Sequence, residues 1–128
     1  MPAMEIVPQP VQGLQVIQGY GDGGFRVAGL RQSGSLLVFP RRTVTWAVTE
    51  FERLTIADFS PVLAAKAEVD LLLVGTGATS QLASRELRAA LRAEGIGLEA
   101  MSTSAACRTF NVLLAEERKV AAALIAVV

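Results

Sequence analysis

The sequence predicts an α/β fold, and three features of its second half predict it. An apolar strand over residues 70–74 ends in Gly75-Thr76-Gly77, a helix pattern covers residues 84–94, and a second strand passes through residues 98–101. Such a strand–helix–strand unit usually joins parallel strands. The segments that follow the two strands therefore share one edge of the sheet, which is where open α/β sheets bind ligands.

The composition limits the classes of function. The chain has 128 residues, 52% of them hydrophobic, which is enough to build a core without metal or disulfide. Twelve basic residues balance twelve acidic ones, so the positive field that attracts nucleic acid is absent. The lack of histidine excludes Ser-His-Asp triads, Cys-His dyads and His-ligated metals within the chain. We expect no cofactor, no metal and no nucleic acid, and we favour a non-enzymatic role.

The two ends indicate location and domain organisation. Residues 1–10 lack the features of a secretory signal or a transit peptide, so we expect a cytoplasmic protein. Residues 1–13 carry three prolines and a glycine, which predicts an extended arm before a single α/β domain over residues 14–128. The longest apolar run, residues 120–128, is well short of the roughly twenty residues that span a bilayer as a helix. It is typical of a strand buried on both faces.

The first half of the chain predicts a β-meander. Residues 14–20 and 25–30 flank the run Gly21-Asp22-Gly23-Gly24, which tolerates positive φ and predicts a hairpin. Ser33-Gly34-Ser35 predicts another turn. Residues 36–39 are apolar and stop at a proline, which makes them the expected third strand of the meander.

The middle of the chain predicts one more strand and a helix. Residues 43–48 are β-branched and aromatic, which predicts a strand or an extended edge. They include Trp46, which we expect in the core. Ser60 as the cap and Pro61 at the first helical position predict a helix that continues through residues 62–67.

The helix between the two parallel strands has clear ends and two distinct faces. Ser84 can cap its start, and Gly95 is a left-handed terminator. Apolar residues recur on one side at helical spacing. Another side carries three arginines that we expect either to be solvated or to contact an anionic partner: Arg85, Arg88 and Arg92.

The first candidate binding element is the Gly75-Thr76-Gly77 turn. A glycine pair after a strand and before a helix lets backbone amides approach an anion. The other interpretation is that a tight strand-to-helix turn needs glycine in any case. The dinucleotide spacing lacks its third glycine, and the lysine of a phosphate-binding loop is missing.

The second candidate element is a helix that begins near Thr103 or Ser104. Its core stripe is Ala106, Phe110, Leu113 and Leu114, at the spacing of a buried helix face. The neighbouring face carries four polar or sulfur-containing residues that could line a crevice at the strand edge: Ser104, Cys107, Arg108 and Asn111.

Each of these residues also has a structural interpretation. Cys107 lies near a helix start and beside Arg108, which favours a thiolate, but a small thiol can equally fill a helix–sheet contact. Arg108 can bind an anion bidentately, or bond to strand-end carbonyls or to Glu99. Asn111 can line the crevice or bond to loop backbone.

At these residues the chain resembles a family of small α/β domains of unassigned biochemical activity. Its members include a mitochondrial assembly factor for respiratory complex I and an adipogenesis-associated cytoplasmic protein of animals. The resemblance extends from about residue 14 to the C-terminus, and its most specific block is residues 105–111, where the family often has tyrosine in place of Phe110. The other matching positions are Tyr20-Gly21, Phe25-Arg26, Gly34-Ser35, Pro40, Trp46, Gly75-Thr76-Gly77, Gly95-Ile96-Gly97 and Met101–Ser104.

The resemblance implies a fold and a general role. It implies three layers, in which a central mixed sheet has the N-terminal β-meander and a helix on one side and helices on the other, and in which residues 118–126 form a last strand antiparallel to the rest. For function it implies a role in protein assembly. Our leading hypothesis is a non-enzymatic protein-binding domain related to complex I assembly factors. The alternative is a small-molecule or anion-binding protein with a reactive thiol in the crevice.

Overall fold

The computed structural model describes residues 13–128, so the predicted N-terminal arm lies outside the described residues except for Gly13. The described chain forms a five-stranded sheet with the order β5-β4-β8-β6-β7 and a three-stranded sheet with the order β1-β2-β3. The strands are β1 (Ile17–Gly21), β2 (Gly24–Val27), β3 (Leu30–Ser33), β4 (Ser35–Val38), β5 (Thr43–Trp46), β6 (Leu71–Gly75), β7 (Gly97–Met101) and β8 (Val120–Leu124). The helices are α1 (Ser60–Ala64), α2 (Arg85–Ala93) and α3 (Thr103–Ala115), with the 3-10 helices η1 (Phe51–Arg53), η2 (Ile56–Phe59) and η3 (Lys66–Glu68).

The five-stranded sheet is mixed, which confirms the predicted fold class. β6 is parallel to β7 and to β8, while β4 is antiparallel to β8 and to β5. The expectation that the last strand is antiparallel to the rest is therefore wrong. The chain leaves β7, crosses the sheet through α3 and enters β8 in the direction of β6, because a helical crossover returns the chain parallel to the strand it left.

The N-terminal meander differs from the prediction in its third strand. β1, β2 and β3 form it, and β3 follows a turn at Ala28-Gly29 in which both residues have positive φ (50° and 85°). The predicted third strand, β4, instead pairs with β5 and β8 in the large sheet. Alanine seldom adopts this left-handed conformation, so the sequence shows no turn at Ala28.

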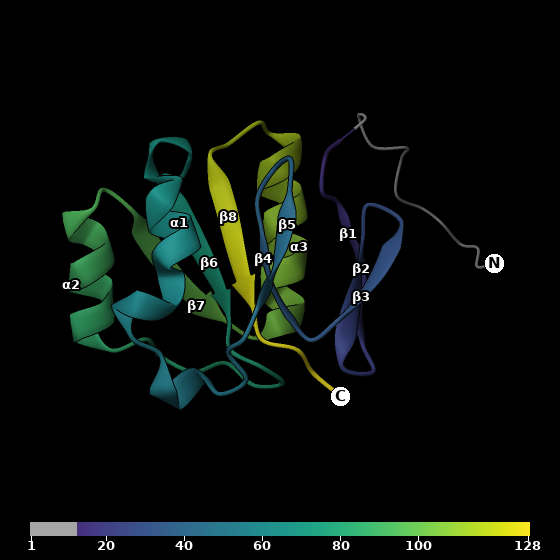
Figure 1. The fold of residues 1–128 in the computed structure, drawn as a ribbon, viewed down its shortest axis with the longest axis horizontal. Helices are drawn as coiled ribbons and strands as arrows, with labels where there is room; N and C mark the ends of the chain where they lie inside the picture. The colour runs from purple at the N-terminus through teal and green to yellow at the C-terminus, as the bar shows by residue number, and fades with distance from the viewer. Residues whose placement is uncertain (1–12) are drawn as a thin grey trace.

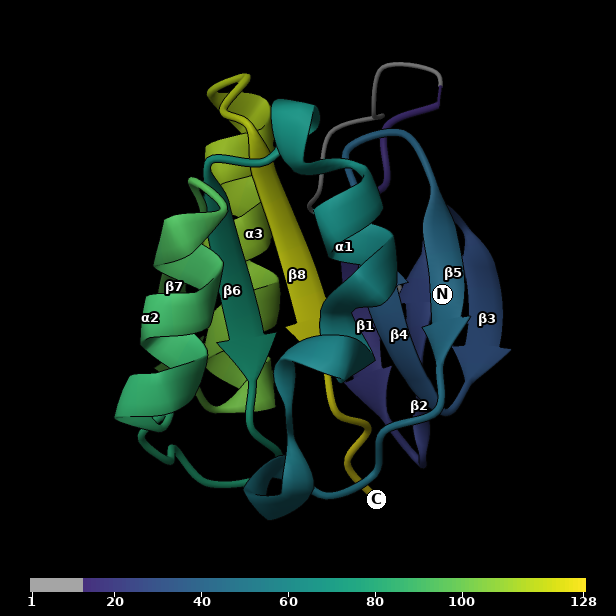
Figure 2. The same cartoon turned by 60° about the vertical axis from the view of Figure 1, so that its left-hand side comes forward.

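The large sheet is covered on both faces (Figures 1 and 2). On one face α1, α2 and the 3-10 helices cover a core that includes Leu72 and Val74 of β6. On the other face α3 and the three-stranded sheet cover a second core that includes Leu73 of β6. Alternate side chains of one strand thus serve two cores, as expected for a strand with both faces buried.

β8 is the central strand of the large sheet, and all five of its residues are buried. Its sequence, Val-Ala-Ala-Ala-Leu, gives small side chains to both cores. The predicted double burial of the C-terminal run is correct for this strand. Between residues 13 and 128 no helix is both long and apolar enough to cross a membrane.

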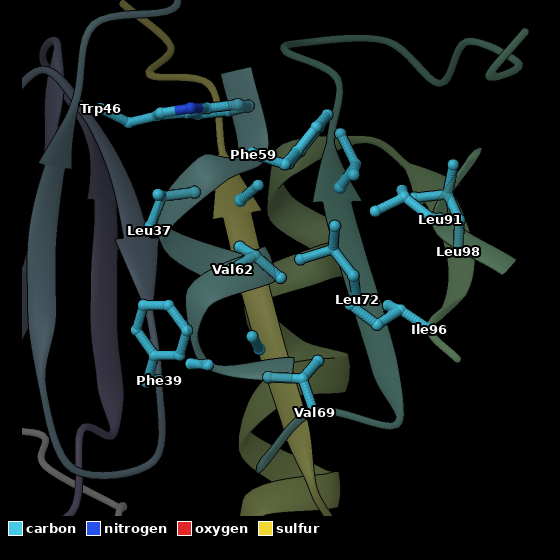
Figure 3. Close-up of a cluster of buried hydrophobic side chains, with 14 of the residues drawn as sticks. Leu37, Phe39, Trp46, Phe59, Val62, Val69, Leu72, Leu91, Ile96 and Leu98 are labelled. Atoms are coloured by element: carbon cyan, nitrogen blue, oxygen red, sulfur yellow. The ribbon is translucent and has the colours of Figure 1, made fainter. Parts of the chain in front are cut away.

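Aromatic side chains of η2 and β5 pack against each other over the first face (Figure 3). Trp46 is 7% exposed, and its indole N–H donates to the Asp58 carbonyl at 2.8 Å. Its ring centroid lies 5.5 Å from that of Phe59 in a tilted arrangement. Trp46 is therefore a core residue, as predicted, and its one polar atom is satisfied.

The ends of α2 follow the predicted chemistry, α3 begins at Thr103 as predicted, and the start of α1 differs from the prediction. The Ser84 hydroxyl accepts a hydrogen bond from the Leu87 N–H, and Gly95 follows α2 with a φ of 83°. Ser102 caps α3 in the same way. Ser60 is the first residue of α1 rather than its cap, because η2 runs directly into α1, and the helix ends at Ala64.

The arginine stripe of α2 is only partly solvated. Arg85 and Arg92 are exposed, whereas Arg88 is half-buried and donates to the Leu98 carbonyl at 2.9 Å. This bond joins α2 to β7, which is an edge strand of the large sheet. Arg88 therefore has a structural role that neither interpretation of the stripe included.

Candidate functional site

Thr103, the first residue of α3, lies at the edge of the sheet where β6, β7 and β8 end. Its side chain is fully buried. Its hydroxyl donates to the Ile125 carbonyl at 2.7 Å and accepts from the Gly77 N–H at 3.0 Å. Its own N–H donates to the Gly77 carbonyl at 2.8 Å. Thr103 thus ties the segments that follow β6 and β8 to the start of α3.

Sequence reasoning selected Ser104 at this helix start and missed Thr103. A signal was nevertheless present, because Thr103 stands three residues before Ala106 and seven before Phe110. This spacing continues the buried face of the helix to its first residue. A threonine on that face must satisfy its hydroxyl inside the protein.

Gly75, the last residue of β6, lies against the start of α3. A Cβ atom built at this position would be 2.9 Å from both the Cα and the Oγ1 of Thr103. A side chain there would therefore push the helix backbone away from the strand. The observed reason for glycine at position 75 is the close approach of α3, whereas Gly77 has a φ of 108°, which agrees with the interpretation that the turn itself needs glycine.

Thr76 is buried, and its polar atoms bond to the surrounding backbone. Its hydroxyl lies 2.6 Å from the Thr79 carbonyl and 3.1 Å from the Met101 carbonyl, and its N–H donates to the Met101 carbonyl at 2.8 Å. The Gln81 side chain donates to the Thr76 carbonyl at 3.4 Å. These bonds hold the loop after β6 against the end of β7.

The other predicted site residues on α3 point in different directions. Ser104 is half-buried, with its hydroxyl 3.4 Å from that of Ser102. Asn111 reaches the three-stranded sheet, where its amide accepts from the Ile17 N–H and donates to the Ile17 carbonyl, both at 2.8 Å. Asn111 therefore bonds to backbone, as one interpretation allowed, but to a strand rather than a loop.

Cys107 lies in the second core, with 4% of its surface exposed. Burial raises the pKa of its thiol to about 12, and the nearby positive charge of Arg108 lowers it only in part. The thiol is therefore protonated at neutral pH, and a thiol in this state is a poor nucleophile. Its position agrees with the packing interpretation rather than with that of a reactive thiol.

Arg108 is exposed on the outer side of α3. Within residues 13–128 its side chain makes no hydrogen bond or ion pair, so the pairing with Glu99 considered above does not form there. The structure thus brings Gly75, Thr76 and Gly77 together around Thr103. The structure points Cys107 into the core and leaves Arg108 on the surface. The ligand-binding roles predicted for these residues stay predictions.

The described residues contain no cluster of three or more histidine, cysteine, aspartate or glutamate side chains that could hold a metal ion. The polar groups at the strand edge mainly contact one another and the local backbone. These hydrogen bonds connect the ends of three strands to the start of one helix.

Similar proteins share most of this domain. An uncharacterised protein of Rhodobacter capsulatus is 41% identical over 109 residues, which cover 85% of this chain and 82% of that protein. NADH dehydrogenase [ubiquinone] 1 alpha subcomplex assembly factor 3 of mouse and that of human are each 33% identical over 85% of this chain. The matched segment covers 59% of each of these two assembly factors.

Solved structures show the same fold. The crystal structure described as that of an outer membrane protein from Bartonella henselae has a TM-score of 0.84 and 42% identity, over 91% of this chain and 98% of that one. A solution structure of a Bordetella pertussis protein, described as an Mth938-like domain, has a TM-score of 0.81 and 31% identity, over 95% of this chain and 92% of that one. The model of the family described as "Protein of unknown function (DUF498/DUF598)" matches residues 17–125, and the chain therefore belongs to that family.

Proposed function

We propose that this domain is a non-enzymatic, protein-binding assembly factor for a respiratory NADH dehydrogenase. The observation that carries the proposal is its 33% identity, over 85% of its length, to proteins named as assembly factors of that enzyme in mouse and human. The chain spans 59% of the length of those relatives. The shared part is the folded α/β domain, so the proposal assigns partner binding to this domain.

The geometry of the strand edge supports a binding role over catalysis. Thr76 and Thr103 use their hydroxyls to join backbone segments. Cys107 is buried, and its pKa is raised to about 12. These three residues therefore support the fold, which leaves the outer surface to contact partners. A free cysteine also fits action in the cytoplasm, which we include in the proposal.

Deletion of the gene in the organism that carries it tests this proposal. We expect the NADH:ubiquinone oxidoreductase activity of isolated membranes to fall and succinate dehydrogenase activity to stay unchanged, because assembly of one enzyme alone is affected. A plasmid copy of the wild-type gene should restore the activity.

Unchanged NADH:ubiquinone oxidoreductase activity in the deletion strain would contradict the proposal. A higher melting temperature of the purified protein with an anionic metabolite, lost in Arg108→Ala, would then favour the anion-binding alternative.

A further inference from the structure

An apolar groove lies between the segment of η1 and η2 and the start of α2. It consists of two adjoining hollows of about 310 Å³ and 300 Å³, which share Leu54, Ser84 and Leu87. We call it the η–α2 groove. Its remaining lining residues are Phe51, Glu52, Thr55, Ile56, Gln81, Leu82, Glu86 and Ala90.

Apolar side chains line part of the groove, at its floor, along its wall and at its rim. Leu87 is buried at the floor, and Leu54 and Ile56 are half-buried along the wall. Leu82 lies at the rim with 88% of its surface exposed. An exposed leucine side chain lacks the favourable free energy that it would gain on burial. Contact with an apolar segment would recover that free energy.

The two charged side chains in the groove lining are acidic, while Arg53 and Arg85 stand beside them in the sequence. Of its lining residues only Glu52 and Glu86 are charged, and one of them lies in each hollow. Both are exposed, and within residues 13–128 neither makes an ion pair. The neighbouring Arg53 is already paired with Glu50 at 2.8 Å. A basic group on a bound segment would therefore find a carboxylate at either hollow.

We propose that the η–α2 groove binds a short apolar segment of a partner protein, flanked by lysine or arginine. This inference rests on the proposed function and states the chemistry of the partner. Residues 1–12 of the chain are a poor occupant, because they contain one acidic residue and no basic one. The occupant that complements both the apolar floor and the two carboxylates is a basic, apolar segment of another protein.

Selection from a displayed library of random short peptides tests the chemistry directly. We expect the wild-type protein to enrich peptides that combine large apolar residues with lysine or arginine. Their affinity should fall about tenfold or more in Leu82→Asp and in the double variant Glu52→Lys/Glu86→Lys. The matched control is Val112→Asp, because α3 covers the opposite face of the sheet. This variant should bind the selected peptides as tightly as the wild type does.

Two results of the selection would overturn the inference. One is enrichment of acidic peptides, or of none at all. The other is equal binding by the wild type and Leu82→Asp. Because Leu82 is 88% exposed, we expect the aspartate variant to keep the wild-type melting temperature, so a loss of binding would not reflect unfolding. The double charge variant serves as the second line of evidence.

Complementation of the deletion strain separates this inference from the proposed function. If the wild-type gene restores NADH:ubiquinone oxidoreductase activity and Leu82→Asp does not, the groove is supported as the docking site. If both restore it, the inference is wrong while the proposed function stands. If deletion has no effect, the proposed function fails, and the peptide selection alone decides the groove.

A second copy of the chain is the remaining occupant to exclude. Sedimentation of the purified wild type should show a monomer. A dimer that dissociates in Leu82→Asp would assign the groove to self-association and overturn the proposed partner.

Discussion

At the residue scale, Thr103 joins two backbone segments at the strand edge. One buried hydroxyl accepts from the Gly77 N–H and donates to the Ile125 carbonyl. These two backbone groups follow different strands, so one side chain fixes the relative position of both. A buried backbone group that loses its partner costs about 1–3 kcal/mol.

Replacement of Thr103 separates the hydroxyl from the bulk of the side chain. Thr103→Val keeps the shape and removes both hydrogen bonds, so we expect the free energy of unfolding to fall by about 2–4 kcal/mol. Thr103→Ser keeps the hydroxyl and should cost about 1 kcal/mol for the lost methyl group. Urea denaturation of the three proteins measures both values, and equal losses in the two variants would contradict the assigned role.

Cys107 predicts a pH dependence of stability. Burial raises the pKa of its thiol from 9.0 to about 12, so the folded protein keeps the proton to a higher pH than the unfolded chain. The stabilisation is fully present below about pH 9 and is lost as pH rises towards 12. Between about pH 8 and pH 10 the wild type should lose about 1.4 kcal/mol more than Cys107→Ala. Denaturant midpoints across this range test it, and parallel curves would show that Cys107 is ionised or exposed in the folded state.

At the scale of elements, Asn111 joins two parts of the structure. Its side-chain amide pairs with the N–H and carbonyl of Ile17 in the same way as a neighbouring strand would. Ile17 belongs to β1, an edge strand of the three-stranded sheet. Edge strands expose unpaired backbone groups, which are sites of unwanted pairing. Asn111 therefore covers part of that edge and fixes the small sheet to α3.

The Asn111→Ala variant should loosen the three-stranded sheet without unfolding the large one. We expect amide hydrogen exchange to accelerate in β1 and β2 and to stay near wild type in β6 and β8, because the lost bonds fix only the small sheet. Val112→Ala, on the same helix but 56% exposed, is the matched control. Equal acceleration in both sheets would mean that they open as one cooperative unit.

The elements also show why part of the site was predictable and part was not. Ser84 and Gly95 bound α2 because capping depends on local residues. The turn at Ala28 could not be predicted, since the positive φ of this residue is set by the pairing of β2 with β3 rather than by residue type. Cys107 was grouped with polar neighbours, although its spacing from Thr103 and Phe110 places it on the buried face. The partner of each side chain depends on tertiary contacts that spacing alone does not define.

At the scale of the whole molecule, the last strand in sequence is central in space. β8 lies between β4 and β6, antiparallel to the first and parallel to the second. It therefore connects the antiparallel β4–β5 pair, which precedes the helices, to the parallel β6–β7 unit. Both hydrophobic cores include residues of β8, so we expect neither core to form without the C-terminal strand.

Truncation tests this dependence. A chain that ends at residue 119 lacks β8 and leaves β4 and β6 without the strand between them, so we expect no cooperative unfolding transition. A chain that ends at residue 125 keeps β8 and loses the bonds of Ala126 to Ser35 and of Val127 to Gly23. It should unfold cooperatively with a free energy about 1–3 kcal/mol lower than that of the full chain. Circular dichroism in urea distinguishes these outcomes, and a sharp transition in the shorter chain would mean that the remaining strands form a core without β8.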